Sequence, residues 1–187
     1  MRLCIPVILL LAATIAFAQD LPKDRWAEWQ PFLGTWEGAG GGSPGQGSGS
    51  FTFTAELQGA VLERHNYAQY PATRDNRGPR RAPRAPGWKP AYRHDDLMVI
   101  YPDPRRNKTR ADYWDSEGHV IHYFVEFAGG GRKLMMLSDP AQPGPRYRLT
   151  YLKTGDNDLK LTFEIAPSDA PEQFKTYIEA AAKRTKN

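Results

Sequence analysis

The stretches FTFTAEL (residues 51–57) and LKLTFEI (residues 159–165) decide the fold of this chain. In each, apolar and polar residues alternate strictly, as in a β-strand with one buried face. Weaker stretches of the same kind are separated by short sequences rich in Gly, Pro, Asn and Asp, which are typical of turns. These weaker strands are expected at about residues 33–40, 60–70, 95–101, 109–115, 120–127, 133–138 and 146–153.

Consecutive strands with no helices between them favour antiparallel pairing of sequence neighbours. We therefore predict a mainly β protein, an antiparallel up-and-down (meander) barrel of about nine or ten strands, which leaves no open sheet edge. A two-sheet sandwich is the alternative. A short N-terminal turn or helix is predicted within residues 24–32. A C-terminal helix is predicted over residues 169–185 from a stripe at helical spacing, formed by Phe174, Tyr177, Ile178 and Ala181.

The first 18 residues have the features of a secretory signal peptide. Arg2 precedes an apolar run, and AFA at residues 16–18 matches a cleavage site before Gln19. Cleavage between Ala18 and Gln19 leaves one domain, residues 19–187, without cysteine, because Cys4 is the only cysteine of the chain. The predicted location is secreted, in the bacterial periplasm.

The net charge of +4 is concentrated in a proline-broken insertion over residues 71–93, which is predicted to be a loop. Five basic residues there are candidates for contact with an anionic surface, namely Arg77, Arg80, Arg81, Arg84 and Lys89. One functional alternative is therefore a non-enzymatic envelope interaction module. A solvated loop without a specific partner is the simpler interpretation. No nucleic-acid partner is predicted, because aromatic residues are sparse in the loop and the protein is expected to be exported.

No motif in the sequence defines a reaction. The glycines of GGGSPG (residues 40–45) match a dinucleotide fingerprint, but Pro44 and the strand that follows leave no helix N-terminus for a pyrophosphate. An enzyme using His65 or Arg110 with Asp112 rests only on residue types, so no catalytic residue is assigned. No metal ligand is assigned either, because the spacing of His119 and His122 places them on opposite faces of a strand. A site assembled across strands around His65 or His94 is left open.

Aromatic residues occur on nearly every expected strand. A barrel of this size is either filled by such side chains or holds a pocket for one small ligand. The predicted function is binding of a small hydrophobic or amphipathic molecule in the lumen, and an unpaired buried cation there would indicate a ligand with a carboxylate. The candidate lining residues are Trp36, Phe51, Phe53, His65, Tyr101, Arg110, Tyr113, Trp114, Tyr123, Tyr147 and Phe163.

Residues 32–40, FLGTWEGAG, resemble the opening strand of lipocalin-like and nitrobindin-like barrels. In those barrels a Gly-x-Trp follows a short N-terminal helix and the Trp closes one end. The stretches LQGAVL (57–62), YPDP (101–104) and YWDSEG (113–118) are similar to the bacterial DUF1579 family of lipocalin-like proteins. The resemblance spans residues 32–118 and implies a calycin-type barrel without an assigned activity.

Nitrobindin-like proteins bind haem through a histidine near the C-terminal end of the barrel. No histidine follows His122 in this chain. Haem is therefore not predicted, and no other cofactor is.

Overall fold

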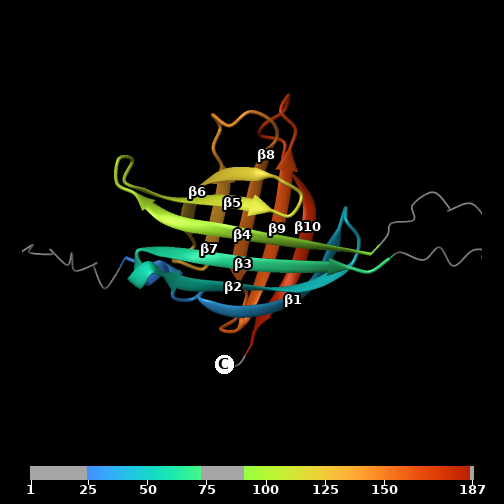
Figure 1. Cartoon of the computed structure of the whole chain (residues 1–187), viewed down its shortest axis with the longest axis horizontal. Helices are drawn as coiled ribbons and strands as arrows, with labels where there is room; N and C mark the ends of the chain where they lie inside the picture. The colour runs from blue at the N-terminus through green and yellow to red at the C-terminus, as the bar shows by residue number, and fades with distance from the viewer. Residues whose placement is uncertain (1–24, 73–90, 186–187) are drawn as a thin grey trace, which may run out of the picture.

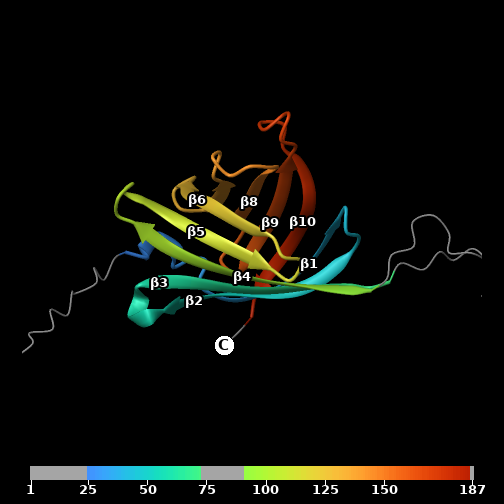
Figure 2. The same ribbon diagram turned by 45° about the horizontal axis from the view of Figure 1, so that its top comes forward.

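The computed structural model describes residues 25–72 and 91–185, and within them ten antiparallel strands close into one barrel (Figures 1 and 2). Each strand pairs with its sequence neighbours, and β10 returns to pair with β1. The predicted meander barrel is confirmed, and the sandwich alternative is excluded. The strands are β1 Gly34–Gly42, β2 Gly47–Glu56, β3 Val61–Tyr70, β4 Tyr92–Asp103, β5 Lys108–Asp115, β6 Val120–Ala128, β7 Lys133–Ser138, β8 Arg146–Lys153, β9 Asp158–Ala166 and β10 Lys175–Arg184.

Residues 51–56 of the first stretch lie in β2, and the second stretch lies in β9. Leu57 was predicted on the buried face, but it begins the turn η2 and is 75% exposed. Phe51 and Phe53 of β2 are buried, as their alternation predicted. Leu159 of β9 is buried, and Leu161 and Phe163 pack against the core from the same face. Directly paired residues of antiparallel strands point to the same side of the sheet. The pairing of Trp36 with Phe51 therefore extends the apolar inner wall from β2 into β1.

The predicted C-terminal helix is wrong, because most of residues 169–185 form strand β10. The alanines of this segment favour a helix in isolation, but β10 hydrogen-bonds to both β1 and β9 and so closes the barrel. Ala180 and Ala182 lie opposite Gly40 and Gly38 of β1. Small side chains at these positions let the two strands approach, so tertiary pairing overrides helix propensity.

The N-terminal segment was predicted as a short turn or helix, and within the described residues only the turn is present. This is the short 3-10 turn η1, at Ala27–Trp29. Pro31 follows at once and cannot donate to a helical ladder. A second 3-10 turn, η2, spans Leu57–Gly59 between β2 and β3.

The glycine-rich stretch after Trp36 is part of the barrel wall. Residues 38–42 belong to β1, and β2 begins at Gly47. A Cβ on Gly40 would lie 2.1 Å from the backbone oxygen of Glu179, and one on Gly49 would lie 2.0 Å from the backbone oxygen of Tyr67. The glycines thus permit close contact between neighbouring backbones. This role agrees with the rejection of a phosphate-binding loop in the sequence analysis.

Several predictions fall on residues outside the described part of the chain. These are the signal peptide at residues 1–18 and the basic residues Arg77, Arg80, Arg81, Arg84 and Lys89. The secreted location and the anionic-surface contact therefore stay predictions. The predicted loop is shorter at its C-terminal end, because Tyr92 and Arg93 already belong to β4. No helix in the described residues is long and apolar enough to cross a membrane.

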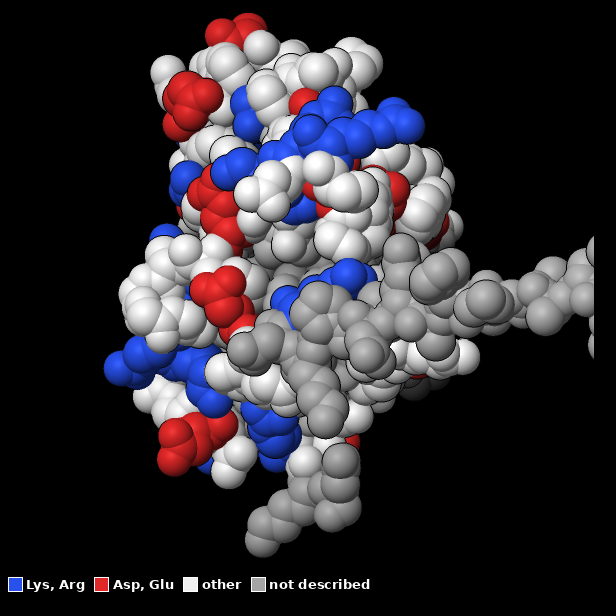
Figure 3. Space-filling view, turned by 90° about the vertical axis from the view of Figure 1, so that its left-hand side faces the viewer, with Lys and Arg blue, Asp and Glu red and all other residues white. Residues whose placement is uncertain are grey.

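The exterior of the described barrel carries both signs of charge. On the face seen in Figure 3, Lys and Arg side chains are interspersed with Asp and Glu. Exposed ion pairs include Arg106 with Asp103 and Lys160 with Glu179, each at 2.9 Å. The excess of Lys and Arg over Asp and Glu in the sequence therefore does not form a basic patch on this face.

Candidate functional site

One end of the barrel is closed by aromatic side chains that come from outside the strands. Trp29 of η1 is 2% exposed and packs edge-on against Phe53 and Phe127, with ring centroids 5.8 and 5.4 Å apart. The indole of Trp26 donates a hydrogen bond to the carbonyl of Gly59 at 2.8 Å. In Figure 1 the N-terminal segment and the β1–β2 hairpin lie at opposite ends of the barrel. The aromatic plug therefore leaves the hairpin end for access.

Strand β10 holds this plug in place. Arg184, near its end, donates hydrogen bonds to the carbonyls of Pro31 and Leu33. Its guanidinium also lies 4.3 Å from the ring centroid of Trp36. Trp36 in turn donates from its indole nitrogen to the carbonyl of Phe32 at 2.8 Å. The tryptophan that the family resemblance places at one end of the barrel is thus fully buried at the closed end.

The other half of the barrel contains a cavity of about 360 Å³. This volume lies within the range of small-molecule sites, about 300–1,000 Å³. Its lining includes Tyr92, which is 38% exposed, and the rim residues Pro44 and Tyr70 beside the β1–β2 hairpin and the end of β3. The cavity therefore opens at the end opposite the aromatic plug.

One wall of the cavity is apolar. It is formed by inward side chains of β2, β6, β8, β9 and β10. Tyr147 and Phe163 stack with an interplanar angle of 5° and centroids 6.0 Å apart. Flat aromatic surface of this kind suits the face of a planar or hydrocarbon group. The main apolar lining residues are Phe51, Ile121, Tyr123, Tyr147, Leu149, Leu161, Phe163 and Ile178.

The opposite wall, on β3 and β4, is polar. Arg64 is 3% exposed and donates a short hydrogen bond from Nη1 to Oδ1 of Asp96, which is 8% exposed. Asn66 donates to the other Asp96 oxygen at 2.7 Å. Burial opposes the charge of Arg64, but the Asp96 carboxylate and the neighbouring tyrosines together outweigh it and hold the pKa of the guanidinium above its ordinary value. Arg64 is therefore a buried cation that is paired with a carboxylate.

Not all of the Arg64 donors are used. Its Nε is buried without a hydrogen-bond partner among the described residues, as is the hydroxyl of Tyr151. The guanidinium carbon lies 5.4 Å from the ring centroid of Phe51. An unsatisfied buried donor costs about 1–3 kcal/mol. The guanidinium carbon also lies 5.8 Å from the ring centroid of Tyr151, so the two unpaired groups belong to the same buried region.

The polar wall continues to the mouth of the cavity through His94. Its Nε2 lies 3.3 Å from Oδ2 of Asp96 and 3.2 Å from the hydroxyl of Tyr113, and its Nδ1 lies 3.0 Å from Oε1 of Glu117. Hydrogen bonding to Asp96 is the main reason that the pKa of His94 rises to about 9, with Glu117 adding to it against the effect of burial. His94 is therefore charged at neutral pH.

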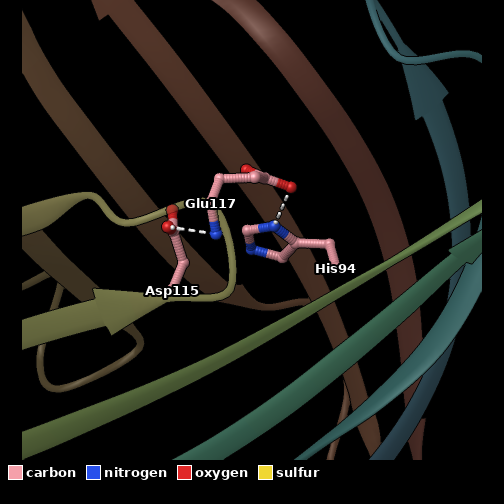
Figure 4. A group of neighbouring side chains, drawn as sticks. All are labelled: His94, Asp115 and Glu117. Carbon is pink, nitrogen blue, oxygen red and sulfur yellow. Dashed lines mark hydrogen bonds and ion pairs between the residues drawn. The ribbon is translucent and has the colours of Figure 1, made fainter.

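Asp115 lies beside this histidine at the end of β5 (Figure 4). Its Oδ1 accepts the backbone N–H groups of Glu117 and His119 at 3.0 and 2.9 Å. Its Oδ2 lies 2.8 Å from Nδ1 of His119. Burial acts in the opposite direction, but the bonds from His119 prevail and lower the pKa of Asp115. Asp115 is therefore a carboxylate fixed by the β5–β6 turn.

The structure divides the predicted lining residues into three groups. Phe51, Tyr113, Tyr123, Tyr147 and Phe163 line the cavity. Trp36 and Phe53 are buried but belong to the closed half, where they pack with Phe51. The remaining four, His65, Tyr101, Arg110 and Trp114, do not face the lumen.

The register of the sheet explains these four positions. His65 pairs with Glu63 at 2.6 Å on the outer face, and Trp114 is 41% exposed. Tyr101 donates to Asp112 at 3.0 Å. Its cross-strand partner Arg110 forms an ion pair with Asp139 at 3.0 Å. All four side chains point to the outer face of the barrel. Their residue types alone did not show which face of the strand they would occupy.

The same register separates the residues of the enzyme hypothesis. His65 is paired with Glu63 and Arg110 with Asp139, whereas Asp112 contacts Tyr101 and His122. His122 points outward between buried Ile121 and Tyr123, as predicted. Of the polar residues that line the cavity, Arg64 was considered as a buried group that points into the lumen, whereas Asn66, His94, Asp96 and Asp115 were not candidates for the lining. The sequence feature that could have identified them is spacing by two: His94 and Asp96 point to one face of β4, and Tyr113 and Asp115 point to one face of β5.

Together, the fold and the cavity define a closed ten-strand antiparallel meander barrel with a lumen that opens at one end. No protein-family model and no curated protein matches the sequence. Solved structures with a similar fold include a de novo designed fluorescence-activating β-barrel, at 14% identity and a TM-score of 0.40. The match covers 83% of this chain and 95% of that one.

Two further barrels are similar. The S-type phycobiliprotein lyase CPES from Guillardia theta has 7% identity and a TM-score of 0.44, covering 85% of this chain and 91% of that one. EF1p2_mFAP2b bound to DFHBI has 11% identity and a TM-score of 0.34, covering 84% and 97%. At this level of similarity these structures carry no information about function.

Proposed function

We propose that this protein binds one small amphipathic molecule in the lumen of the barrel. The observation that carries the proposal is the cavity of about 360 Å³, with a flat aromatic and aliphatic wall facing a polar wall. Burial of apolar ligand surface contributes about 25 cal/mol per Å². The aromatic wall would therefore supply most of the affinity, and the polar wall would orient the ligand.

The charges of the cavity favour a ligand without a carboxylate. Arg64, the buried cation that would select an anion, is already matched by Asp96. Asp115 and Glu117 add negative charge at the mouth, beside His94. The amide of Asn66 on the polar wall uses one N–H for Asp96 and can donate the other to a neutral acceptor, such as a carbonyl or an ether oxygen. We therefore propose an uncharged molecule with a planar or hydrocarbon body and an oxygen acceptor.

Titration with Nile red, an uncharged planar dye with a carbonyl oxygen, tests this proposal. We expect saturable fluorescence enhancement with one dye molecule per chain. Leu161→Trp should lower the dye affinity at least tenfold, because Leu161 lines the cavity and a larger side chain there would occupy the dye volume. A tenfold loss corresponds to about 1.4 kcal/mol.

Leu152→Trp is the matched control, since Leu152 is 38% exposed on the outside of β8 next to β9. This variant should bind Nile red like the native protein. Far-ultraviolet circular dichroism of both variants checks that the barrel is retained. Non-saturable binding, or equal affinities of folded Leu161→Trp and the native protein, would refute the proposed function.

A further inference from the structure

Three metal-ligating side chains converge at the mouth of the lumen. His94 comes from β4, Asp115 ends β5, and Glu117 lies in the turn that follows (Figure 4). One potential ligand atom from each lies within 4.8 Å of the other two. The nearest measured approach is 3.0 Å, between Nδ1 of His94 and Oε1 of Glu117. This convergence depends on the register of β4 with β5, which also pairs Asp96 with Asp115.

The separations suit a small divalent ion. Bonds from zinc to nitrogen or carboxylate oxygen are about 2.0–2.2 Å, so at a tetrahedral angle two ligand atoms of one ion lie about 3.3–3.6 Å apart. The 3.0 Å between Nδ1 of His94 and Oε1 of Glu117 is already shorter than this, whereas the 4.8 Å limit for the whole set exceeds it by about 1.2–1.5 Å. Glu117 has a side chain that is 45% exposed, so it can move by that amount at little cost.

The surroundings of His94 add a separate argument. A histidine that ligates a metal usually donates its other ring N–H to a carboxylate, which fixes the tautomer and the orientation of the ring. Here Nε2 faces Asp96 at 3.3 Å, which leaves Nδ1 on the side of Glu117. Asp96 is itself held by buried Arg64 and by Asn66. The outer contacts of a metal-binding histidine are therefore already in place, and zinc would displace the proton that His94 carries on Nδ1 at neutral pH.

We propose that His94, Asp115 and Glu117 bind a zinc ion at the mouth of the lumen. A mixed set of one imidazole and two carboxylates suits zinc and its first-row neighbours better than calcium or magnesium, which prefer oxygen ligands alone. Three protein ligands leave a fourth zinc position open. All three side chains line the cavity, so this position faces the lumen or its entrance.

His119 contacts both carboxylates of the proposed site. Its Nδ1 lies 2.8 Å from Oδ2 of Asp115 and 3.9 Å from Oε2 of Glu117. We assign it the role of a positioning residue that orients the Asp115 carboxylate. His119→Gln should keep one zinc ion per chain, weaken its binding and alter the visible absorption spectrum of the cobalt-substituted protein.

Calorimetric titration of the tag-free, chelator-treated protein with zinc chloride tests the site, without any lumen ligand present. We expect one zinc ion per chain, at least tenfold weaker binding by Glu117→Gln, and loss of saturable binding in His94→Ala. Glu117→Gln is the decisive variant, because this exposed turn side chain can change without disturbing the core. The cobalt spectrum should report nitrogen ligation in the native protein and lose that signature in His94→Ala.

His65→Ala and Glu63→Gln are matched controls, since this pair has the same residue types at 2.6 Å but lies on the outer face of β3. Both controls should bind zinc within twofold of the native protein. Absence of saturable zinc binding, or equal affinity in the native protein and Glu117→Gln, would overturn the proposal. Nile red binding is measured separately and without zinc. A failure of the zinc proposal can therefore be distinguished from a failure of the proposed function.

Discussion

Replacing Trp29 with alanine is expected to lower the free energy of unfolding by about 3–5 kcal/mol, the usual cost of removing a buried large aromatic side chain. Trp29 is 2% exposed and contacts Trp26, Phe53 and Phe127 at once. Its removal would leave a void where the plug meets the strands, which neighbouring backbone cannot fill. Urea denaturation followed by circular dichroism measures the loss.

Trp114→Ala is the control for this prediction. Trp114 is 41% exposed on the outer face of β5, so the same truncation there should change the free energy of unfolding by no more than about 1 kcal/mol. Equal losses in the two variants would show that the N-terminal segment does not close the barrel as described.

The second large effect is expected from Asp96→Ala. This change leaves Arg64 charged and buried without its carboxylate, and breaking a buried ion pair on one side typically costs about 3–5 kcal/mol. Arg64 is only 3% exposed, so water compensates little for the lost carboxylate. Urea denaturation should show a lower midpoint, and the Arg64→Met/Asp96→Leu double variant should recover much of the loss.

Asp95→Ala separates this effect from a general effect of losing a carboxylate in β4. Asp95 is the sequence neighbour of Asp96, but its side chain is 48% exposed and pairs with exposed Arg93 at 2.6 Å. Because exposed pairs of this kind contribute little, its denaturation midpoint should remain that of the native protein. A midpoint as low as that of Asp96→Ala would contradict the role of Arg64 burial.

Much of the fold was predictable because strand alternation is a local signal. FTFTAEL and LKLTFEI each contain the alternating part of a strand, and turn residues mark the hairpins. The last strand was missed for the opposite reason. Its tyrosine and alanines also satisfy helical spacing, and only the neighbours Gly38 and Gly40 across β1 make the extended form preferable. Barrel closure depends on contacts between residues far apart in the sequence, so a short stretch of sequence does not predict it.

The site was less predictable than the fold. Tyr123 and Phe163, which alternation placed on an inner face, line the cavity, and their role in ligand binding stays a prediction. Arg110 and Tyr101 were assigned inward because their residue types suit a binding site, although the register turns them outward. His94 and Asp115 lie 21 positions apart in the sequence, and only the pairing of β4 with β5 brings them to one mouth.

Chemical-shift mapping of Nile red on the isotope-labelled protein tests the central claim most directly, because it reports where the dye sits. We predict that the shifted backbone amides cluster around the cavity, at residues such as Phe51, Asn66 and Leu161. Amides near Trp29, at the closed end, should not move. Shifts confined to the exposed apolar residues Trp114, Val120 and Leu152 on the outer face would contradict a ligand-binding lumen.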